Sequence, residues 1–397
     1  MIFLFINYSE EKSRETGAFN TLKEIAQQPR LWKEANASLA AEQDRIKAFF
    51  QMLFDKHEKI NVIFTGAGTS AFVGETILPY LQQKGGKQRF NFQSIATTNL
   101  VSNPYYFFER ETPTLLVSFA RSGNSPESVA SVKLGEQLVR NFYQINITCN
   151  PEGYLAAGSS DNERTLLLLM PEGSNDRGFA MTSSFTCMML TALLLFREEG
   201  IRDYQTVITR LADRVETMFN TRAEKLETMA AESFQKIVYL GSGPFLGLSH
   251  EASLKFLELT AGKLSVYYES PLGFRHGPKS LIDDQTMIVL FLSKHPYTRK
   301  YDLDLLKELK ADPARVNLAV ISDVYEKEVD EIVDYYFFGE KENLGSADDT
   351  WLSFEYIAHA QLLAVYKSIS LNIKPDNPSP SGSVNRVVKG VTIYDYE

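Results

Sequence analysis

The sequence predicts an α/β protein with two tandem, doubly wound parallel sheets, each covered by helices on both faces. Short, wholly apolar runs alternate with stretches of helical periodicity, a pattern typical of parallel strands buried on both sides. The same order of runs then recurs at a near-constant offset, which suggests duplication. Residues 61–64 correspond to 237–240, residues 114–117 to 286–289, and the strand before Asn150 to the strand before Asp323.

The pattern divides the chain into four parts. A helical N-terminal segment is expected to break at Pro29, because proline lacks the backbone N–H that a helix interior needs. A charged helical stretch joins the two sheets, and three prolines in the last part predict an extended arm. The predicted parts are the helical segment 1–45, a first α/β domain 46–205, a second α/β domain 222–370 and a tail 371–397.

Composition excludes several classes of function. The chain has 397 residues, and its 41 basic and 50 acidic side chains give a net charge of −9. Nucleic-acid binding needs a basic face, so no nucleic-acid partner is expected. Two cysteines cannot build a disulfide framework or a cysteine zinc site. The five histidines lack zinc-helix spacing, so no bound metal is expected.

One stretch has nearly the length of a membrane span. Residues 178–196 carry no charge, but their many hydroxyl side chains make a poor spanning helix. A buried helix with a hydroxyl-rich start is the better interpretation. We therefore expect a soluble, cytoplasmic protein that has no membrane partner.

The segment 118–127 is the most informative part of the first domain. A strand ends there, hydroxyls and Gly123 follow, and Pro126 stands where a helix would begin. Ser122, Ser125 and the free backbone N–H groups at the start of that helix would surround a phosphate. A simple capped turn is the alternative. The corresponding segment of the second domain, 293–296, has no glycine and fewer hydroxyls, so we expect a phosphate cradle in one half only.

A second loop, 66–70, has a Gly-x-Gly pattern after a strand. That pattern alone is typical of dinucleotide sites, but the acidic residue expected about twenty positions later is missing. Phe90 and Phe92 occupy that region instead. The sequence therefore favours a second phosphate loop over a nicotinamide cofactor site.

Two motifs in the second domain could supply proton transfer. Glu251, Lys255 and Glu258 are spaced to share one face of a helix. Their apolar neighbours suggest a covered helix, where a carboxylate beside a lysine is a candidate general base, although a solvated charge stripe is the usual alternative. His276 lies on a glycine- and proline-rich loop and could open a sugar ring, or could be structural.

Taken together, these motifs resemble the sugar isomerase (SIS) superfamily in its double-domain form. They are similar in particular to the galactosamine-6-phosphate deaminase/isomerase family, long labelled tagatose-6-phosphate ketose/aldose isomerase. The resemblance covers nearly the whole chain. The segments that carry it are 24–29, 175–185 and 269–278.

The chain also resembles, more distantly, the isomerase half of glucosamine-6-phosphate synthase, and this likeness implies a role for each position. Ala120 replaces a phosphate-binding serine of that relative. Arg121 replaces a glutamine, and its guanidinium could compensate with charge-assisted bonds. The implied substrate-binding residues are Thr69, Ser70, Arg121, Ser122, Gly123, Asn124, Ser125, Phe179 and Ala180.

The same resemblance implies the catalytic residues. Glu258 would be the base that moves the ring-carbon proton, with Glu251 and Lys255 keeping their places on its helix. His276 would open the ring in the site of the neighbouring subunit, and Lys389 would reach the site from the tail. The resemblance thus implies a homodimer with shared active sites.

The implied function is an isomerising deaminase that converts galactosamine 6-phosphate to tagatose 6-phosphate and ammonia without a cofactor. Two alternatives stay open. One is aldose–ketose isomerisation of a hexose 6-phosphate without deamination. The other is a non-catalytic regulator that senses a sugar phosphate, although residues 1–60 contain no basic helix-turn-helix and a sensor has no need of Glu258.

Overall fold

The computed structural model describes residues 4–159, 162–197, 204–339, 344–345, 347–382, 385–386 and 390–397. Backbone contacts divide the chain into two compact units. We call one the N-terminal-sheet unit, made of Arg30–Asp176, Ser183–Gln205 and Ser381–Glu397. We call the other the C-terminal-sheet unit, made of Met1–Pro29, Arg177–Thr182 and Thr206–Pro380.

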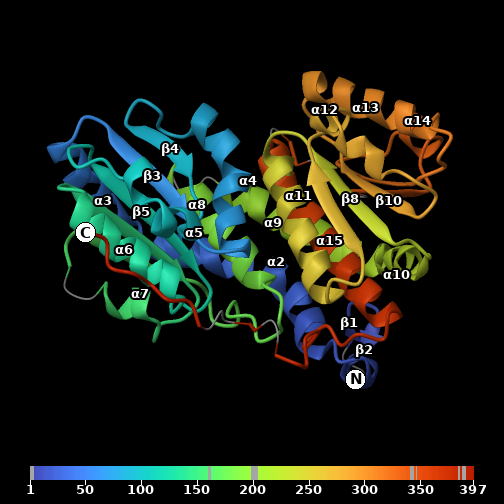
Figure 1. Ribbon diagram of the computed structural model, residues 1–397, viewed down its shortest axis with the longest axis horizontal. Helices are drawn as coiled ribbons and strands as arrows, with labels where there is room; N and C mark the ends of the chain where they lie inside the picture. The colour runs from blue at the N-terminus through green and yellow to red at the C-terminus, as the bar shows by residue number, and fades with distance from the viewer. Residues whose placement is uncertain are drawn as a thin grey trace. The chain divides into compact units, whose positions relative to one another are not determined.

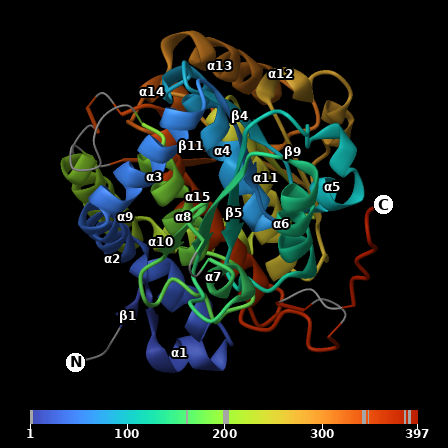
Figure 2. The ribbon, with the colours of Figure 1, turned by 90° about the vertical axis from the view of Figure 1, so that its left-hand side faces the viewer.

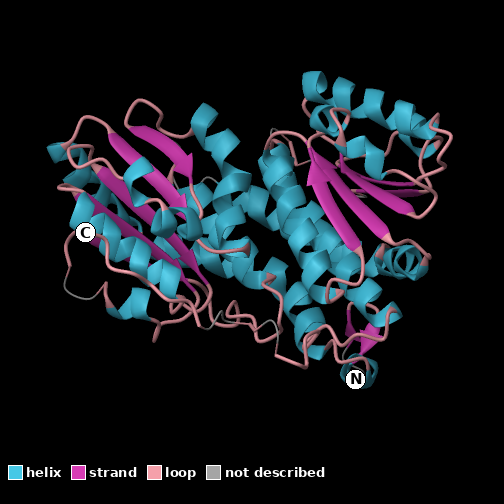
Figure 3. Ribbon diagram, viewed as in Figure 1, coloured by secondary structure: helices cyan, strands magenta, loops and turns pink. Residues whose placement is uncertain are grey.

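In the described part of the chain, the N-terminal-sheet unit contains a five-stranded sheet in the order β4-β3-β5-β6-β7. Figure 3 shows the strands in magenta. Every neighbouring pair of strands is parallel. The strands are β3 (Ile60–Thr65), β4 (Phe90–Ser94), β5 (Thr114–Ala120), β6 (Phe142–Thr148) and β7 (Thr165–Leu169).

The C-terminal-sheet unit repeats this order with its own described strands, β9-β8-β10-β11-β12, and all pairs are again parallel. Two parallel sheets with helices on both faces confirm the fold class predicted from the sequence. The strands are β8 (Lys236–Gly241), β9 (Ser265–Glu269), β10 (Thr286–Phe291), β11 (Asn317–Ser322) and β12 (Tyr335–Phe338). A small antiparallel hairpin, β1 (Leu4–Phe5) and β2 (Tyr8–Ser9), precedes α1 (Glu10–Glu15).

Helices cover both faces of each sheet. Successive strand residues point to opposite sides, so an apolar strand needs cover on both. In the N-terminal-sheet unit, Ile63 and Leu116 share a core cluster with residues of α5 and α6, whereas Phe64 packs against Phe92 and Phe196 on the α8 side. Helices α5, α6 and α8 are labelled in Figures 1 and 2. The helices are α3 (Gln43–Lys56), α4 (Thr69–Lys84), α5 (Thr97–Ser102), η1 (Pro104–Tyr106), α6 (Pro126–Leu138), α7 (Tyr154–Ala157) and α8 (Ser183–Leu195).

The C-terminal-sheet unit follows the same rule. Val238 and Leu240 of β8 join the core beneath α12 and α13, while Tyr239 between them packs against Phe256 of α11. Helix α15 is buried along nearly its whole length. The helices are α9 (Gln205–Thr221), α10 (Ala223–Ala231), α11 (Pro244–Leu259), α12 (Pro271–Phe274), η3 (Pro278–Leu281), α13 (Pro296–Lys310), α14 (Lys327–Asp330) and α15 (Asp349–Ser370).

One local prediction was wrong. The helix α2 (Phe19–Ala41) continues through Pro29 instead of breaking there. Buried Leu22, Ile25, Trp32 and Ala35 lie on both sides of the proline, and their packing compensates for the one missing backbone hydrogen bond.

The other local predictions hold in the described residues. Every residue of α8 is buried, as predicted for the charge-free stretch 178–196. No helix of the described residues is long and apolar enough to cross a membrane. The described tail residues beyond 372 form no helix, as the prolines predict.

Burial of Asp302 makes stability depend on pH. The Asp302 carboxylate is wholly buried in α13, and desolvation raises its pKa from 3.8 to about 6. The folded state therefore holds this proton more tightly than the unfolded state, and the resulting stability is lost as pH rises through about 6. Two pKa units correspond to roughly 3 kcal/mol. We expect urea midpoints to fall between pH 4 and pH 7, and to fall less in Asp302→Asn. An equal fall in both proteins would contradict this assignment.

Candidate active site

The first predicted loop connects β3 to α4 at the carboxyl edge of the N-terminal sheet. Gly66 is required there, because a Cβ atom on it would lie 2.5 Å from the Ser70 backbone carbon. The tight turn brings Thr69 and Ser70 into the first turn of α4, and both side chains are buried. These two hydroxyls thus lie at a helix start, the position that a phosphate loop uses. The Ser70 and Ala71 N–H groups donate there to the Ala67 and Gly68 carbonyls, at 3.2 and 2.8 Å.

The second loop connects the neighbouring strand β5 to α6, so it opens at the same edge of the sheet. Gly123 has a φ of 67°, a backbone conformation that favours glycine. The Asn124 side chain accepts a hydrogen bond from the Tyr154 N–H at 2.9 Å, which fastens the loop to α7. Ser125 is the N-cap residue of α6, but its hydroxyl pairs with Ser128 at 2.6 Å and caps no backbone N–H. Among the described residues, the Ser122 hydroxyl accepts only the Asn124 N–H, at 3.3 Å.

Arg121 is held by the tail. It is buried, and its guanidinium donates a 2.8 Å hydrogen bond to the carbonyl oxygen of Arg386. The Arg386 side chain in turn donates to Asn175 and to the Asp176 carbonyl. Sequence reasoning missed this role of Arg386. Its position between Asn385 and Lys389, in a tail segment already singled out, was the available signal. Lys389 itself lies outside the described residues.

Two further hydroxyls were also missed. Thr65 ends β3 and Ser118 is its register partner on β5. Both side-chain oxygens are buried, and neither has a hydrogen-bond partner among the described residues. Hydroxyls in otherwise apolar strands were the signal in the sequence. Thr65 and Ser118 lie directly before the two loops, at the carboxyl edge of the sheet.

The corresponding loop of the C-terminal sheet is already filled by carboxylates of the same chain. The Lys294 N–H donates to Asp349 at 2.8 Å, and the Ser293 hydroxyl also donates to Asp349. The Ser293 N–H donates to Asp302 at 3.1 Å. The donors of this loop correspond to those that would bind an anion in the N-terminal sheet, but here they bind Asp302 and Asp349. This supports the expectation of a phosphate cradle in one half only.

Phe179 and Ala180 belong to a short segment of the C-terminal-sheet unit. Glu24 of α2 accepts hydrogen bonds from the Arg177 and Gly178 N–H groups, at 2.5 and 3.2 Å. A Cβ atom on Gly178 would lie 2.9 Å from Glu24, so the close approach requires glycine. Phe179 is half-buried and Ala180 fully buried. The structure thus fixes the backbone that presents both residues.

Helix α11 carries the acidic and basic residues predicted to share one face. Glu251 and Lys255 are fully buried, and Glu258 remains half-buried near the end of the helix. The Lys255 ammonium pairs with Glu258, and it lies 3.8 Å from Glu251. The solvated charge stripe is therefore excluded. Among these three groups, the Glu258 carboxylate is the one with access to solvent.

His276 lies on the loop between α12 and η3, and its side chain is exposed. The flanking Arg275 and Lys279 both bind Glu308 of α13, at 2.8 and 2.6 Å. These pairs lower the pKa of Glu308 and raise that of Lys279. They anchor the loop, while no hydrogen bond is seen between the His276 ring and the described residues of its own chain.

The structure therefore groups the predicted residues in two sets. The loops with Thr69 and Ser122 share one sheet edge in the N-terminal-sheet unit, and the row ending at Glu258 belongs to the C-terminal-sheet unit with His276. In the first set, buried hydroxyls and helix starts suit an oxyanion. In the second set, a half-buried carboxylate suits proton transfer. Within the described ranges, no three acidic, histidine or cysteine side chains gather in a way that could hold a metal ion.

Comparison with known proteins gives full-length relatives. No family model matches the chain. The D-galactosamine-6-phosphate deaminase AgaS of Escherichia coli is 43% identical over 381 residues, which are 95% of this chain and 96% of that protein. The protein of the same name from Shewanella sp. (strain ANA-3) is 39% identical over 390 residues, covering 98% and 95%. A solved structure from Clostridium novyi NT, provisionally named a tagatose-6-phosphate ketose/aldose isomerase, is 42% identical, covers both chains fully and has a TM-score of 0.94.

Proposed function

This chain belongs to the D-galactosamine-6-phosphate deaminase family, and we propose on that basis that it converts galactosamine 6-phosphate and water to tagatose 6-phosphate and ammonia. The observation that carries the chemistry is the row of charges on α11. Lys255 binds two carboxylates in a buried helix, and of these only Glu258 has access to solvent. A carboxylate oriented in this way is suited to move one proton between adjacent carbon atoms.

The proposed reaction begins with the closed sugar ring. His276 assists the transfer of a proton to the ring oxygen, so that the C1–O5 bond breaks and an aldehyde forms at C1. Glu258 then removes the proton from C2, and the electron pair passes through a C1–C2 double bond to the aldehyde oxygen, which is protonated. The resulting enol carries the amine on C2.

The second half of the reaction returns the proton. Protonated Glu258 delivers its proton to C1, and an imine forms at C2. Water adds to the imine carbon, the C–N bond breaks, and ammonia leaves the C2 ketone of tagatose 6-phosphate. Lys255 takes no proton in this scheme. It orients Glu258 through their ion pair, and it partly neutralises the buried charge of Glu251.

The phosphate serves as the handle for the substrate. We assign it to Thr69, Ser70 and the 121–125 loop, whose hydroxyls and helix-start N–H groups face one sheet edge. The Arg386 carbonyl occupies a donor of Arg121, so this arginine also ties the tail to the loop. Lys389 is assigned to the site on the resemblance alone.

Removing one hydroxyl from this cradle tests the phosphate assignment. Ser122→Ala deletes an oxygen that accepts only a long hydrogen bond within the protein, so folding should be unaffected. We expect KM to rise about tenfold with kcat nearly unchanged, because the lost bond serves ground and transition states alike. Ser38→Ala, which removes an exposed hydroxyl of α2, is the matched control. Unchanged KM in Ser122→Ala would contradict the assignment.

A second candidate function is aldose–ketose isomerisation without deamination, because a structure at 42% identity bears an isomerase name. Purified protein mixed with galactosamine 6-phosphate distinguishes the two. We expect ammonia and tagatose 6-phosphate in equal amounts. Interconversion of a hexose 6-phosphate pair, with no ammonia from the amino sugar, would favour the isomerase.

We also propose that the working unit is a homodimer. The His276 ring is exposed and lacks a hydrogen bond to described residues of its own chain, which suits a group that completes another subunit's site. A closed two-fold dimer is the smallest assembly in which each chain can both give and receive this histidine.

A further inference from the structure

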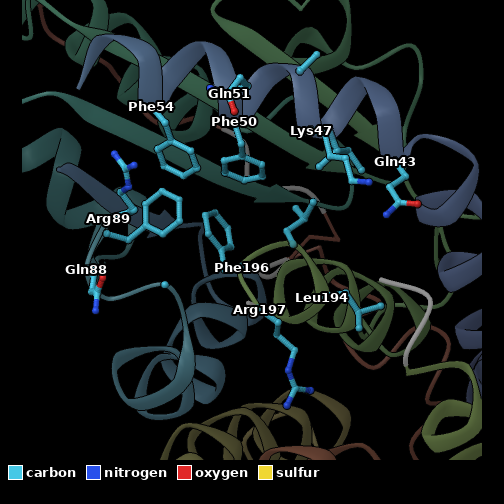
Figure 4. Close-up of a pocket in the computed structure, with 15 residues that line it drawn as sticks. Gln43, Lys47, Phe50, Gln51, Phe54, Gln88, Arg89, Leu194, Phe196 and Arg197 are labelled. Carbon is cyan, nitrogen blue, oxygen red and sulfur yellow. The ribbon is translucent and has the colours of Figure 1, made fainter. Parts of the chain in front are cut away.

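A cavity of about 730 Å³ lies within the N-terminal-sheet unit and has no part in the proposed reaction. It opens between helix α3, the turn before β4 and the end of α8 (Figure 4). This volume is typical of sites for small organic molecules. The described residues that line it are Gln43, Ile46, Lys47, Ala48, Phe50, Gln51, Phe54, Gly86, Gln88, Arg89, Phe90, Leu194, Leu195, Phe196 and Arg197.

Four phenylalanine rings form the apolar part of the lining. Phe90 and Phe196 are buried and meet edge to face with ring centroids 5.5 Å apart. Phe50 and Phe54 of α3 pack against Phe90, with ring centroids 5.9 and 5.4 Å apart, so the four rings form one cluster. Phe50 and Phe54 are only half-buried, and the uncovered side of this cluster lines the cavity (Figure 4). Such walls favour a flat, apolar ring over a hydrated sugar.

The charged groups of the cavity have one sign. Of the described residues that line it, three are charged, and Lys47, Arg89 and Arg197 are all cations. Arg197 points away from the rings and lies over Tyr80 and Tyr204. Lys47 and Arg89 lie at the rim, and neither forms an ion pair with a described carboxylate. Two such cations on a chain of net charge −9 select an anionic ligand.

The cavity is remote from the phosphate loops. Thr69 and Ser70 begin α4, and the turn with Gly86 follows the other end of that 16-residue helix. A helix of this length spans about 24 Å. The cavity therefore lies toward the amino edge of the sheet, where β4 begins, whereas the phosphate loops open at the carboxyl edge.

We propose that this cavity is a binding site for a small planar aromatic anion, distinct from the sugar phosphate. The rings of Phe50, Phe54, Phe90 and Phe196 would hold the aromatic part. Lys47 and Arg89 would bind the anionic group. Arg89 lies over the Phe54 ring, 5.1 Å from its centroid, so its guanidinium stands directly beside the aromatic cluster.

The probe for this proposal is 8-anilinonaphthalene-1-sulfonate, an aromatic anion that fluoresces when bound in an apolar site. We expect the native protein to bind one probe molecule per chain, and galactosamine 6-phosphate not to displace it. Displacement by the sugar phosphate, or no saturable binding by protein with an intact near-ultraviolet circular dichroism spectrum, would overturn the proposal.

A cavity-filling variant locates the bound probe. A Cβ atom on Gly86 would lie 3.5 Å from the Phe90 ring, an ordinary contact distance, and its φ is not positive, so Gly86→Leu fills the cavity without strain. We expect probe affinity to fall about tenfold or more. Lys87→Gln, a change to the exposed neighbour outside the lining, should leave affinity unchanged. Unaltered affinity in Gly86→Leu, or a change in its oligomeric state, would overturn the proposal.

The charge requirement is tested separately. In the double variant Lys47→Gln/Arg89→Gln, affinity for the anionic probe should fall about fivefold, as expected for two partly screened ion pairs. Affinity for the neutral analogue N-phenyl-1-naphthylamine should stay the same. An equal loss for both probes would show that the cations act only through packing, and would contradict selection of an anion.

Discussion

Glu258→Gln should abolish turnover of galactosamine 6-phosphate while leaving its affinity within a few-fold of the unchanged protein. Glutamine has nearly the same shape and can still contact Lys255, but it cannot accept a proton from C2. A positioned general base contributes typically 10² to 10⁴-fold, so we expect kcat to fall by about 10³-fold or more. Ammonia release measures kcat, and isothermal titration with the sugar phosphate measures affinity.

The matched control for this variant is Glu11→Gln. Glu11 is an exposed carboxylate of α1, and no hydrogen bond or ion pair to it is seen among the described residues. We expect this protein to behave as the unchanged one in both assays. Full turnover in Glu258→Gln would remove Glu258 from the role of base. Loss of affinity together with turnover would instead make it a binding group.

Mixing two inactive variants should restore activity. His276→Ala lacks the ring-opening histidine and Glu258→Ala lacks the base, so each homodimer should be nearly inactive. In a mixed dimer, one site receives an intact Glu258 from its own chain and an intact His276 from its partner, and the other site loses both. The symmetry therefore sets a ceiling of about half the unchanged activity for each mixed dimer.

Subunit exchange has to be shown independently, for example by mass spectrometry of dimers with differently tagged chains. Each variant incubated with itself is the control, and its activity should not change. Proven exchange without any recovery would mean that Glu258 and His276 serve the site of the same chain. The proposed sharing of sites would then be wrong, while the assignment of Glu258 as base would stand.

Strands in the centre of each sheet were the easiest to predict. Residues 62–64, 115–117 and 237–240 lie in central strands covered on both faces, where the chain must be apolar at every position. The strands that the sequence did not reveal, β4, β9 and β12, are edges of their sheets. Every residue of β9 is exposed or half-buried, and its apolar run is only the three residues 266–268, too short to recognise.

Candidate site residues were predictable where a loop follows a buried strand. Glycines at 66 and 123, and the hydroxyls beside them, mark both candidate phosphate loops, because few other sequences allow those turns. Long-range contacts left no comparable signal. Arg386 reaches Asp176 across 210 positions. Asp349 fills the loop at Ser293 from 56 positions away, so only the folded chain shows that this loop is occupied.

In the proposed reaction, one carboxylate moves a proton from C2 to C1 before the amine leaves. Nuclear magnetic resonance of the reaction in deuterated water tests this directly. We expect tagatose 6-phosphate that carries up to one deuterium atom per molecule at C1. We also expect one molecule of ammonia for each molecule of tagatose 6-phosphate. If no deuterium appears at C1 after a single turnover, the proton has passed from C2 to C1 without exchange with solvent. In that case Glu258→Gln must also block turnover. Ammonia released together with a product that is still an aldose would contradict the account.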